Sequence, residues 1–396
     1  MLEAQFCCGQ DSSSAASTAG WYSACLPLLA AVVAALALAP AALAGPSLHV
    51  GVVEDAAIWG DPSAQMELAQ QAGFDTIRMT AQWSSGHTEL EHSVLVRIQH
   101  AVLAAQARGI RCVIAIYNTG SSETPADPIL QGEFVAFARN TAASLPLVSI
   151  FVVGNEPNSN YYWQPQFDTR GGDNAAVQYE GLLAQSYDAI KSVRPDATVV
   201  GGALDSAGTD DPAAARPTHS PLTFIRDMGT AYRASGRTRP LVDAFGHNPY
   251  PLRSQEPAAA RHRGGFIGEG DYAELVSTLA AAFSGTPQRS LDVWYLEDGF
   301  QATVPRRLAR RYTGSENVAT VTAGEQAVQL RNAILLAACQ PHVRAFFNFE
   351  LVDETRLAGW QSGLEWRGTS LKPAAAAFGA AARAAERGAV HCPDRP

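Results

Sequence analysis

After residue 46, short hydrophobic runs alternate with longer amphipathic segments that are rich in alanine. Short runs of β-branched and aromatic residues are typical of buried strands, and apolar positions three to four residues apart are typical of helices. The hydrophobic runs predict strands at Leu48–Val53, Thr76–Thr80, Arg111–Tyr117, Val148–Val153, Thr198–Gly202, Val242–Phe245, Val293–Leu296 and Arg344–Phe349. The amphipathic segments predict helices at Ser63–Gln71, Ser93–Ala107, Leu130–Ala143, Ala175–Ser192, Pro221–Ala234, Tyr272–Phe283, Gly324–Ala338 and Pro373–Arg387.

Strands that are each followed by a helix predict parallel pairing through right-handed crossovers. Eight such repeats are what a closed (β/α)8 TIM barrel requires, so we expect residues 46–396 to form a single catalytic α/β domain of this kind. The alternative is an open, doubly wound sheet. Glu54-Asp55-Ala56 follows the first strand in place of a glycine-rich phosphate-binding turn, which disfavours that alternative.

Polar side chains follow almost every predicted strand. In a (β/α)8 barrel the functional groups gather at the carboxyl ends of the strands, whereas the opposite ends are plain turns. Three long loops, 205–220, 251–270 and 300–322, are expected to cover this face. The strand-end residues are Arg78, Gln82, Trp83, Asn118, Asn155, Glu156, Asp205, His247, Asn248, Tyr250, Glu297, Glu350 and Asp353.

The first 45 residues have a different pattern. Leu28 to Ala39 is an unbroken apolar run, and Ala42-Leu43-Ala44 after it is typical of a cleavage site. We therefore expect residues 1–45 to be a signal peptide and the protein to be secreted. Because the first basic residue is Arg78, the positive charge usual in a signal peptide is missing, and an uncleaved membrane anchor stays open as the alternative.

Composition narrows the possible partners. The chain has a formal net charge of −9, which argues against nucleic acid as a partner. Arg306, Arg307, Arg310 and Arg311 are interpreted as a solvated surface. No spacing of His, Cys, Asp or Glu resembles a metal site, so we expect no metal. We also expect no cofactor and a monomeric protein. If the chain is exported, Cys339 and Cys392 could pair, whereas Cys112 lies in an apolar strand and is expected to be a buried thiol.

The most informative stretches are two strands that each end in a glutamate. Val148–Val153 is followed by Gly154-Asn155-Glu156-Pro157, and Glu297 ends the strand at 293–296. Cleavage of a glycosidic bond needs one carboxylic acid to protonate the leaving oxygen and one carboxylate to attack or to activate water. Glu156 and Glu297 on one barrel therefore predict a glycosidase with a carbohydrate substrate.

Other strand-end residues suit the same chemistry. Asn155 could bond a sugar hydroxyl next to the reacting carbon, and Arg78 would keep Glu297 ionised. Tyr250 could donate a hydrogen bond to the same carboxylate. His247, Asn248 and Asn118 are further candidates for substrate binding. Flat apolar faces for a sugar ring are offered by Trp83, Trp163 and Trp360, together with Tyr161 and Tyr162.

At these residues the chain resembles clan A, the superfamily of retaining (β/α)8 glycoside hydrolases with cellulase-like and β-xylosidase-like members. The likeness rests on Gly154-Asn155-Glu156-Pro157-Asn158, on His247-Asn248-Pro249-Tyr250 and on Tyr295-Leu296-Glu297-Asp298-Gly299. It implies a retaining enzyme acting on a β-linked oligo- or polysaccharide. By the resemblance, Glu156 is the acid/base, Glu297 the nucleophile, Asn155 the partner of the 2-hydroxyl and Arg78 the strand-two arginine.

The sequence departs from the superfamily at two strands. His247 stands one position early, and Tyr117-Asn118 stands where cellulase-like members commonly have histidine. These departures leave a carbohydrate-binding barrel without hydrolytic activity as an alternative, and a transglycosylase would use the same two glutamates. The sequence leaves open the sugar, the linkage, and the choice between endo and exo action.

Overall fold

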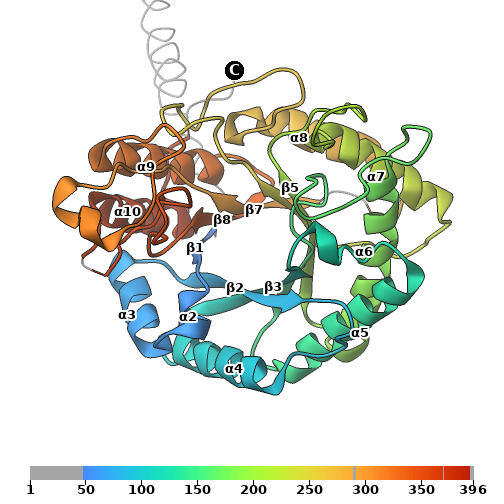
Figure 1. Ribbon diagram of the computed structural model, residues 1–396, viewed down its shortest axis with the longest axis horizontal. Coiled ribbons are helices and arrows are strands. Elements are labelled where there is room, and N and C mark those ends of the chain that lie inside the picture. Colours follow the sequence, from blue (N-terminus) through green and yellow to red (C-terminus); the bar gives the residue numbers. More distant parts are fainter. Residues whose placement is uncertain (1–47, 289–290, 369, 393–396) are drawn as a thin grey trace, which may run out of the picture. The chain divides into compact units, whose positions relative to one another are not determined.

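The computed structural model describes residues 48–288, 291–368 and 370–392, and its eight strands close into a parallel barrel in sequence order. The helices form a ring outside the strands (Figure 1). The expected (β/α)8 fold is therefore confirmed. The predicted signal or anchor segment lies outside the described residues.

Every neighbouring pair of strands is parallel, including the closing pair β1 and β8, in which Val50 lies opposite Phe346. The strands are β1 (His49–Val53), β2 (Thr76–Trp83), β3 (Arg111–Asn118), β4 (Ile150–Val153), β5 (Thr198–Asp205), β6 (Ala244–Asn248), β7 (Asp292–Asp298) and β8 (Val343–Phe349).

The outer ring contains the eight predicted helices and one short helix, α2, that was not predicted. The α-helices are α2 (Ala56–Trp59), α3 (Pro62–Ala72), α4 (His92–Gln106), α5 (Pro128–Ser144), α6 (Asn174–Val193), α7 (Pro221–Ala234), α8 (Tyr272–Ala282), α9 (Ala323–Ala338) and α10 (Pro373–Glu386). Single 3-10 turns lie in the loops at η1 (Ser121–Glu123), η2 (Glu269–Asp271) and η3 (Arg306–Arg311).

Local sequence signals begin several of these helices. α3 and α5 each start with an Asp-Pro pair, in which Asp61 or Asp127 accepts hydrogen bonds from two backbone amides of the first turn. Proline fits the first helical position because the amide it lacks has no partner there. α3 then ends at Gly73, whose φ of 83° lies in the left-handed region. These caps fix where the chain turns back to the barrel.

The centre of the barrel is filled by side chains from nearly all its strands. This cluster includes Val113, Val152, Val200, Trp294 and Phe347, and all of them are buried. A barrel interior of this kind is a packed core and not a pore. The reacting groups must therefore lie above the core, where the strands end.

Two further features concern the rest of the described chain. Cys339 and Cys392 are each disulfide-bonded, and Cys112 is a buried free thiol.

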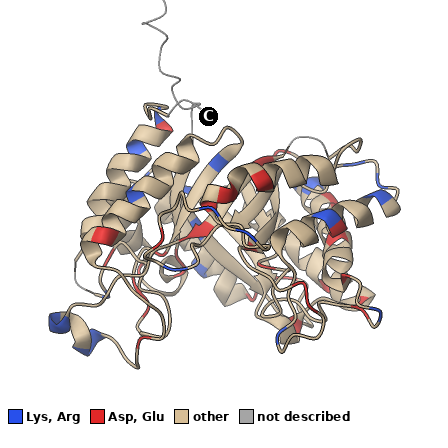
Figure 2. Ribbon diagram, turned by 90° about the horizontal axis from the view of Figure 1, so that it is seen from above, with Lys and Arg blue, Asp and Glu red and all other residues tan. Residues whose placement is uncertain are grey.

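No described helix is long and apolar enough to cross a membrane. Acidic and basic positions are interspersed over the described helices and loops (Figure 2).

Candidate active site

The turn after β4 is held in a conformation that suits glycine. Gly154 has a φ of 86°, and a Cβ atom built on it would lie 2.6 Å from Cε2 of Tyr179. The Tyr179 hydroxyl donates to the Val153 carbonyl at 2.6 Å and accepts from the Gly202 amide at 2.8 Å. Tyr179 on α6 thereby ties the end of β4 to β5, next to the turn that carries Asn155 and Glu156.

Glu156 is the residue that this turn presents. Its own φ is 43°, a left-handed conformation that is uncommon for any residue with a Cβ atom. The Glu156 amide donates to the carbonyl of Ala203 on β5 at 2.8 Å, which stabilises that conformation. Asn248 at the end of β6 donates through Nδ2 to Oε1 of Glu156 at 3.0 Å.

The surroundings of Glu156 favour its protonated form. Burial raises the pKa of this carboxyl well above its usual value, and the negative charges of Asp205 and Glu297 raise it further. The hydrogen bond from Asn248 and the charge of Arg78 act in the opposite direction but are the smaller effects. Glu156 is thus suited to donate a proton near neutral pH.

Glu297 at the end of β7 has different hydrogen-bond partners. Oε1 lies 2.5 Å from Nη1 of Arg78, and Oε2 accepts from the Tyr250 hydroxyl at 3.0 Å. Arg78 is only 1% exposed, so its charge is poorly screened by water. An arginine and a phenol that both donate to one carboxylate fix its orientation.

Arg78 also connects Glu297 to Asn155, the residue before Glu156. Its Nη1 atom donates to the Leu296 carbonyl at 3.3 Å, and Nη2 donates to Oδ1 of Asn155 at 3.3 Å. Arg78 therefore joins β2, β4 and β7 at one point. Two buried carboxyl groups in different hydrogen-bonding environments at one site are an arrangement that general acid and nucleophilic chemistry can use.

An aromatic wall stands beside Glu297. Tyr250 and Trp360 have ring centroids 4.7 Å apart, and Phe349 packs edge-on against Trp360 at 5.4 Å. Burial and the charges of Glu297 and Glu156 raise the pKa of Tyr250 well above its usual value, so the phenol keeps the proton that it donates. Trp360 is therefore well placed to contact a ring bound over Glu297.

Four other candidates are engaged elsewhere. Trp83 is fully buried and donates to the His87 carbonyl, and Trp163 is 3% exposed and donates to Gln178. Neither indole exposes a face to a sugar, because both are buried, with Trp83 packed edge-on against Phe134 and Trp163 against Tyr179. We therefore reassign both tryptophans to the packing between the barrel and its loops.

Asn118 and His247 are reassigned in the same way. Both amide protons of Asn118 go to backbone carbonyls, of Gly120 at 2.7 Å and of Tyr162 at 2.8 Å, so the side chain holds the loop after β4. His247 is fully buried, and its Nε2 atom lies 2.8 Å from the Ile267 carbonyl. Burial lowers the pKa of His247 to about 4, so it is neutral and structural.

Further acidic residues lie near the two glutamates. Asp205 acts on Glu156 as described, and Asp55 accepts from the Thr80 amide at 2.7 Å close to Arg78 and Glu297. Burial and neighbouring carboxylates raise the pKa of Glu350 to about 10. Within the described residues, no group of three or more His, Cys, Asp or Glu residues could hold a metal ion.

No family model matches the chain, and no curated protein is similar to it in sequence. Solved structures do share its fold. A family 39 glycoside hydrolase from the gut symbiont Bacteroides cellulosilyticus is 19% identical, with a TM-score of 0.61. That match covers 85% of this chain but only 64% of the Bacteroides chain.

Two further structures are covered over most of their own length. GH5_18 from Streptomyces cattleya, solved in complex with GlcNAc, is 16% identical over 90% of this chain and 82% of its own, with a TM-score of 0.58. A hyperthermophilic β-glucosidase from Pyrococcus furiosus is 15% identical over 87% of this chain and 97% of its own, with a TM-score of 0.56. Likeness at these identities establishes the barrel fold.

Proposed function

We propose that this chain is a retaining glycoside hydrolase that cleaves O-glycosidic bonds of a β-linked oligo- or polysaccharide. The observation that carries the proposal is the contrast between its two strand-end glutamates. Glu156 is surrounded by groups that favour the acid, whereas Glu297 receives hydrogen bonds from Arg78 and Tyr250. The similar barrels described above include enzymes named as glycoside hydrolases and a β-glucosidase, which agrees with this chemistry.

The reaction has two steps. Glu297 attacks the anomeric carbon through a carboxylate oxygen while the bond to the leaving oxygen breaks, and Glu156 transfers its proton to that oxygen. The product is a glycosyl ester on Glu297. Glu156, now ionised, then takes a proton from water, and the water oxygen displaces Glu297 from the anomeric carbon. Both glutamates return to their starting protonation states.

The neighbouring residues have supporting roles in this scheme. Asn155, held by Arg78 through Oδ1, keeps its Nδ2 group for the sugar hydroxyl next to the reacting carbon. Trp360 supplies an apolar face for the ring. Asn248 bonds to Glu156 and holds it in place for proton transfer.

The stereochemistry of hydrolysis tests the proposal. Wild-type protein is first screened against aryl β-glycosides and β-linked polysaccharides, and the reaction on the best substrate is followed by proton NMR. A retaining enzyme releases the β anomer first, and the α anomer appears later by mutarotation. Release of the α anomer first contradicts the nucleophilic role of Glu297, and binding without hydrolysis across the panel supports a binding barrel.

We propose further that the protein is exported. The support is the pair of disulfide-bonded residues Cys339 and Cys392, since disulfides persist in oxidising compartments and are rare in the cytosol. Cell fractionation of the full chain tests this. Cleaved protein outside the cytoplasm is expected, whereas reduced, uncleaved protein in the cytosol would contradict export.

A further inference from the structure

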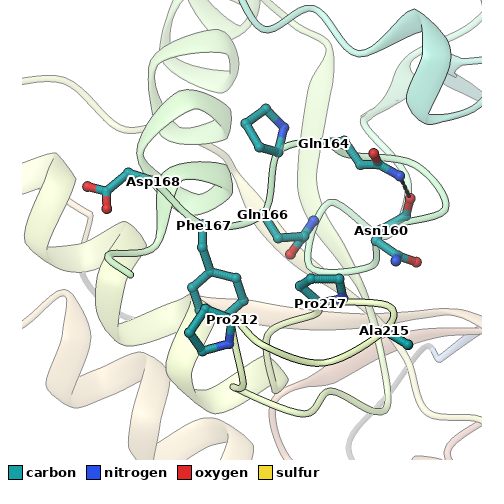
Figure 3. A pocket seen from close by; sticks show the side chains of 9 residues that line it. Asn160, Gln164, Gln166, Phe167, Asp168, Pro212, Ala215 and Pro217 are labelled. Carbon is teal, nitrogen blue, oxygen red and sulfur yellow. Dashed lines mark hydrogen bonds between the residues drawn. The ribbon is translucent and has the colours of Figure 1, made fainter. Parts of the chain in front are cut away.

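A pocket of about 340 Å³ lies between the loop after β4 and the loop after β5, and no role above uses it. Figure 3 shows its side chains converging from the two loops. The first loop contributes Asn160, Gln164, Pro165, Gln166, Phe167 and Asp168, and the second contributes Pro212, Ala215 and Pro217. The volume is sufficient for one six-membered sugar ring.

Gln166 gives this pocket a buried acceptor. Its Nε2 atom donates to the carbonyls of Pro157 at 3.0 Å and Trp163 at 2.9 Å, which uses both amide protons and fixes which way the amide points. Its Oε1 atom is buried and receives no hydrogen bond from the protein. Gln166 itself is only 3% exposed. A buried carbonyl without a donor is costly, so a hydroxyl in the pocket would be bound favourably.

The remaining surface of the pocket is partly apolar and partly polar. The Phe167 ring is partly exposed and is supported from behind by the His219 ring, at 4.0 Å between centroids. In Figure 3, Phe167 and Pro212 lie on one side of the pocket and Asn160 on the other. An apolar ring opposite hydrogen-bonding amides matches a sugar, which has apolar faces and hydroxyls at its edge.

The pocket is built on the chain segment that carries Glu156. Pro157, whose carbonyl holds Gln166, directly follows Glu156, and the Ser159 amide donates to the Glu156 carbonyl at 2.9 Å. In the proposed mechanism Glu156 protonates the leaving oxygen. The loop that begins at Glu156 therefore also forms one side of this pocket.

We propose that this pocket is a binding subsite for a sugar unit of the leaving group, and that the chain therefore acts on oligo- or polysaccharides. The inference rests on the proposed hydrolase function and deepens it. A hydroxyl of the bound unit donates to Gln166 Oε1, and the Phe167 ring packs against the face of that unit. Binding energy from this unit lowers KM for long substrates and has no effect on substrates too short to reach it.

The test fills the pocket without removing any of its contacts. Ala215 is exposed and lines the pocket, so Ala215→Trp places an indole in the space of the sugar. Ala213 is exposed on the same loop but does not line the pocket, and Ala213→Trp is the matched control. KM and kcat are measured on an aryl glycoside and on a series of oligosaccharides of increasing length.

Ala215→Trp is expected to raise KM for the long oligosaccharides by about tenfold, which corresponds to about 1.4 kcal/mol, and to leave KM for the aryl glycoside unchanged. Ala213→Trp is expected to leave KM unchanged for both kinds of substrate. Asn160→Ala removes one polar group from the pocket and is expected to raise KM for the long oligosaccharides about threefold. Equal KM values for Ala215→Trp and Ala213→Trp on every long substrate would overturn the subsite while leaving the hydrolase function intact. Failure of wild type on all glycosides, the aryl glycoside included, would instead overturn the hydrolase function and the subsite with it.

Discussion

Asp205 and Asn248 act on Glu156 in opposite directions. The negative charge of Asp205 raises the pKa of Glu156, and the hydrogen bond from Asn248 lowers it. Because burial is the largest effect and also raises the pKa, the proton stays on Glu156 until the pH rises well above the usual range of a glutamate. The pH at which activity falls on the alkaline side should therefore report the pKa of Glu156.

Replacing Asp205 by asparagine tests that assignment. Asp205→Asn removes a like charge and keeps the side-chain oxygen that accepts from the Ala207 amide at 3.0 Å. The pKa of Glu156 then falls, so the alkaline limb of the kcat/KM profile moves to lower pH. Asp211→Asn removes a charge on the same loop that is not among those raising the pKa of Glu156, so it serves as control and should not move the limb. An alkaline limb that stays in place in Asp205→Asn would mean that Glu156 is not the titrating acid.

Tyr250 allows a similar test at Glu297. Tyr250→Phe keeps the ring that packs on Trp360 and removes only the hydroxyl that donates to Oε2. Loss of one preorganised donor at a reacting carboxylate is expected to lower kcat by about 10². Stability should change by no more than about 1 kcal/mol. Steady-state kinetics and thermal unfolding measure the two effects, and unchanged kcat would show that the phenol has no part in the reaction.

At the scale of elements, the alternation of side chains along each strand explains which strand-end residues meet at the site and which pack elsewhere. Successive residues of a strand point to opposite faces of the sheet. Arg78 and Trp83 are an odd number of positions apart on β2, so Arg78 lies over the barrel axis while Trp83 packs outward on Phe134. His247 and Asn248 are adjacent, and only Asn248 contacts Glu156. Applying this period to β2 and β6 separates Arg78 from Trp83 and Asn248 from His247.

The ends of the strands were harder to predict than their existence. β5 was expected to end at Gly202 and continues to Asp205, and β7 was expected to end at Leu296 and continues to Asp298. In β7 the polar residues Glu297 and Asp298 interrupt the hydrophobic pattern, and in β5 the pair Gly201-Gly202 interrupts it, so the pattern indicates a loop too early. Trp163 was unpredictable for another reason, because its burial depends on Gln178 of α6, a contact between distant segments.

The turn after β4 gives a prediction about a whole element. Gly154→Ala introduces a Cβ atom at a φ of 86° and 2.6 Å from the Tyr179 ring. We expect a loss of about 2 kcal/mol in the free energy of unfolding, together with a fall in kcat because Glu156 shifts. Gly181→Ala in α6 is the control, since nothing lies within 4 Å of its added Cβ and the helix should gain about 0.5–1 kcal/mol. Denaturant unfolding measures both, and equal stability of Gly154→Ala and wild type would contradict the packing described here.

At the scale of the whole molecule, the regular alternation of strands and helices was sufficient to predict the barrel. Each repeat carries its own hydrophobic period, and eight parallel repeats have few other ways to cover both faces of a sheet. The pockets between loops could not be predicted, because they depend on how the long loops after β4 and β5 pack on one another. Gln166 illustrates this, since its role follows only from its contacts with Pro157 and Trp163.

Buried acids throughout the barrel predict how stability depends on pH. Burial raises the pKa of Glu54 to about 7 from 4.5, of Asp298 to about 7 from 3.8, and of Asp173 to about 8 from 3.8. An acid whose pKa is higher in the folded state stabilises the fold below its unfolded pKa, and that stability is lost as the pH rises through the folded pKa. The free energy of unfolding should therefore be larger at pH 6.5 than at pH 8.

Urea unfolding at several pH values between 6.5 and 8 measures this trend. This window avoids His247, whose lowered pKa of about 4 affects stability only below its unfolded value of 6.5. Glu54→Gln cannot titrate and should reduce the slope of stability against pH, whatever its effect on stability itself. Stability that rises with pH across the window would contradict the burial of these acids.

The central claim is that Glu156 and Glu297 act as acid/base and nucleophile on one glycosidic bond, and azide rescue tests it most directly. Glu156→Ala and Glu297→Ala are each given an activated aryl β-glycoside with sodium azide, and the anomeric form of the glycosyl azide is determined by NMR. The account predicts that azide restores turnover in both, giving the β-glycosyl azide with Glu156→Ala and the α-glycosyl azide with Glu297→Ala. The same anomer from both variants, or full activity of either variant without azide, would contradict it.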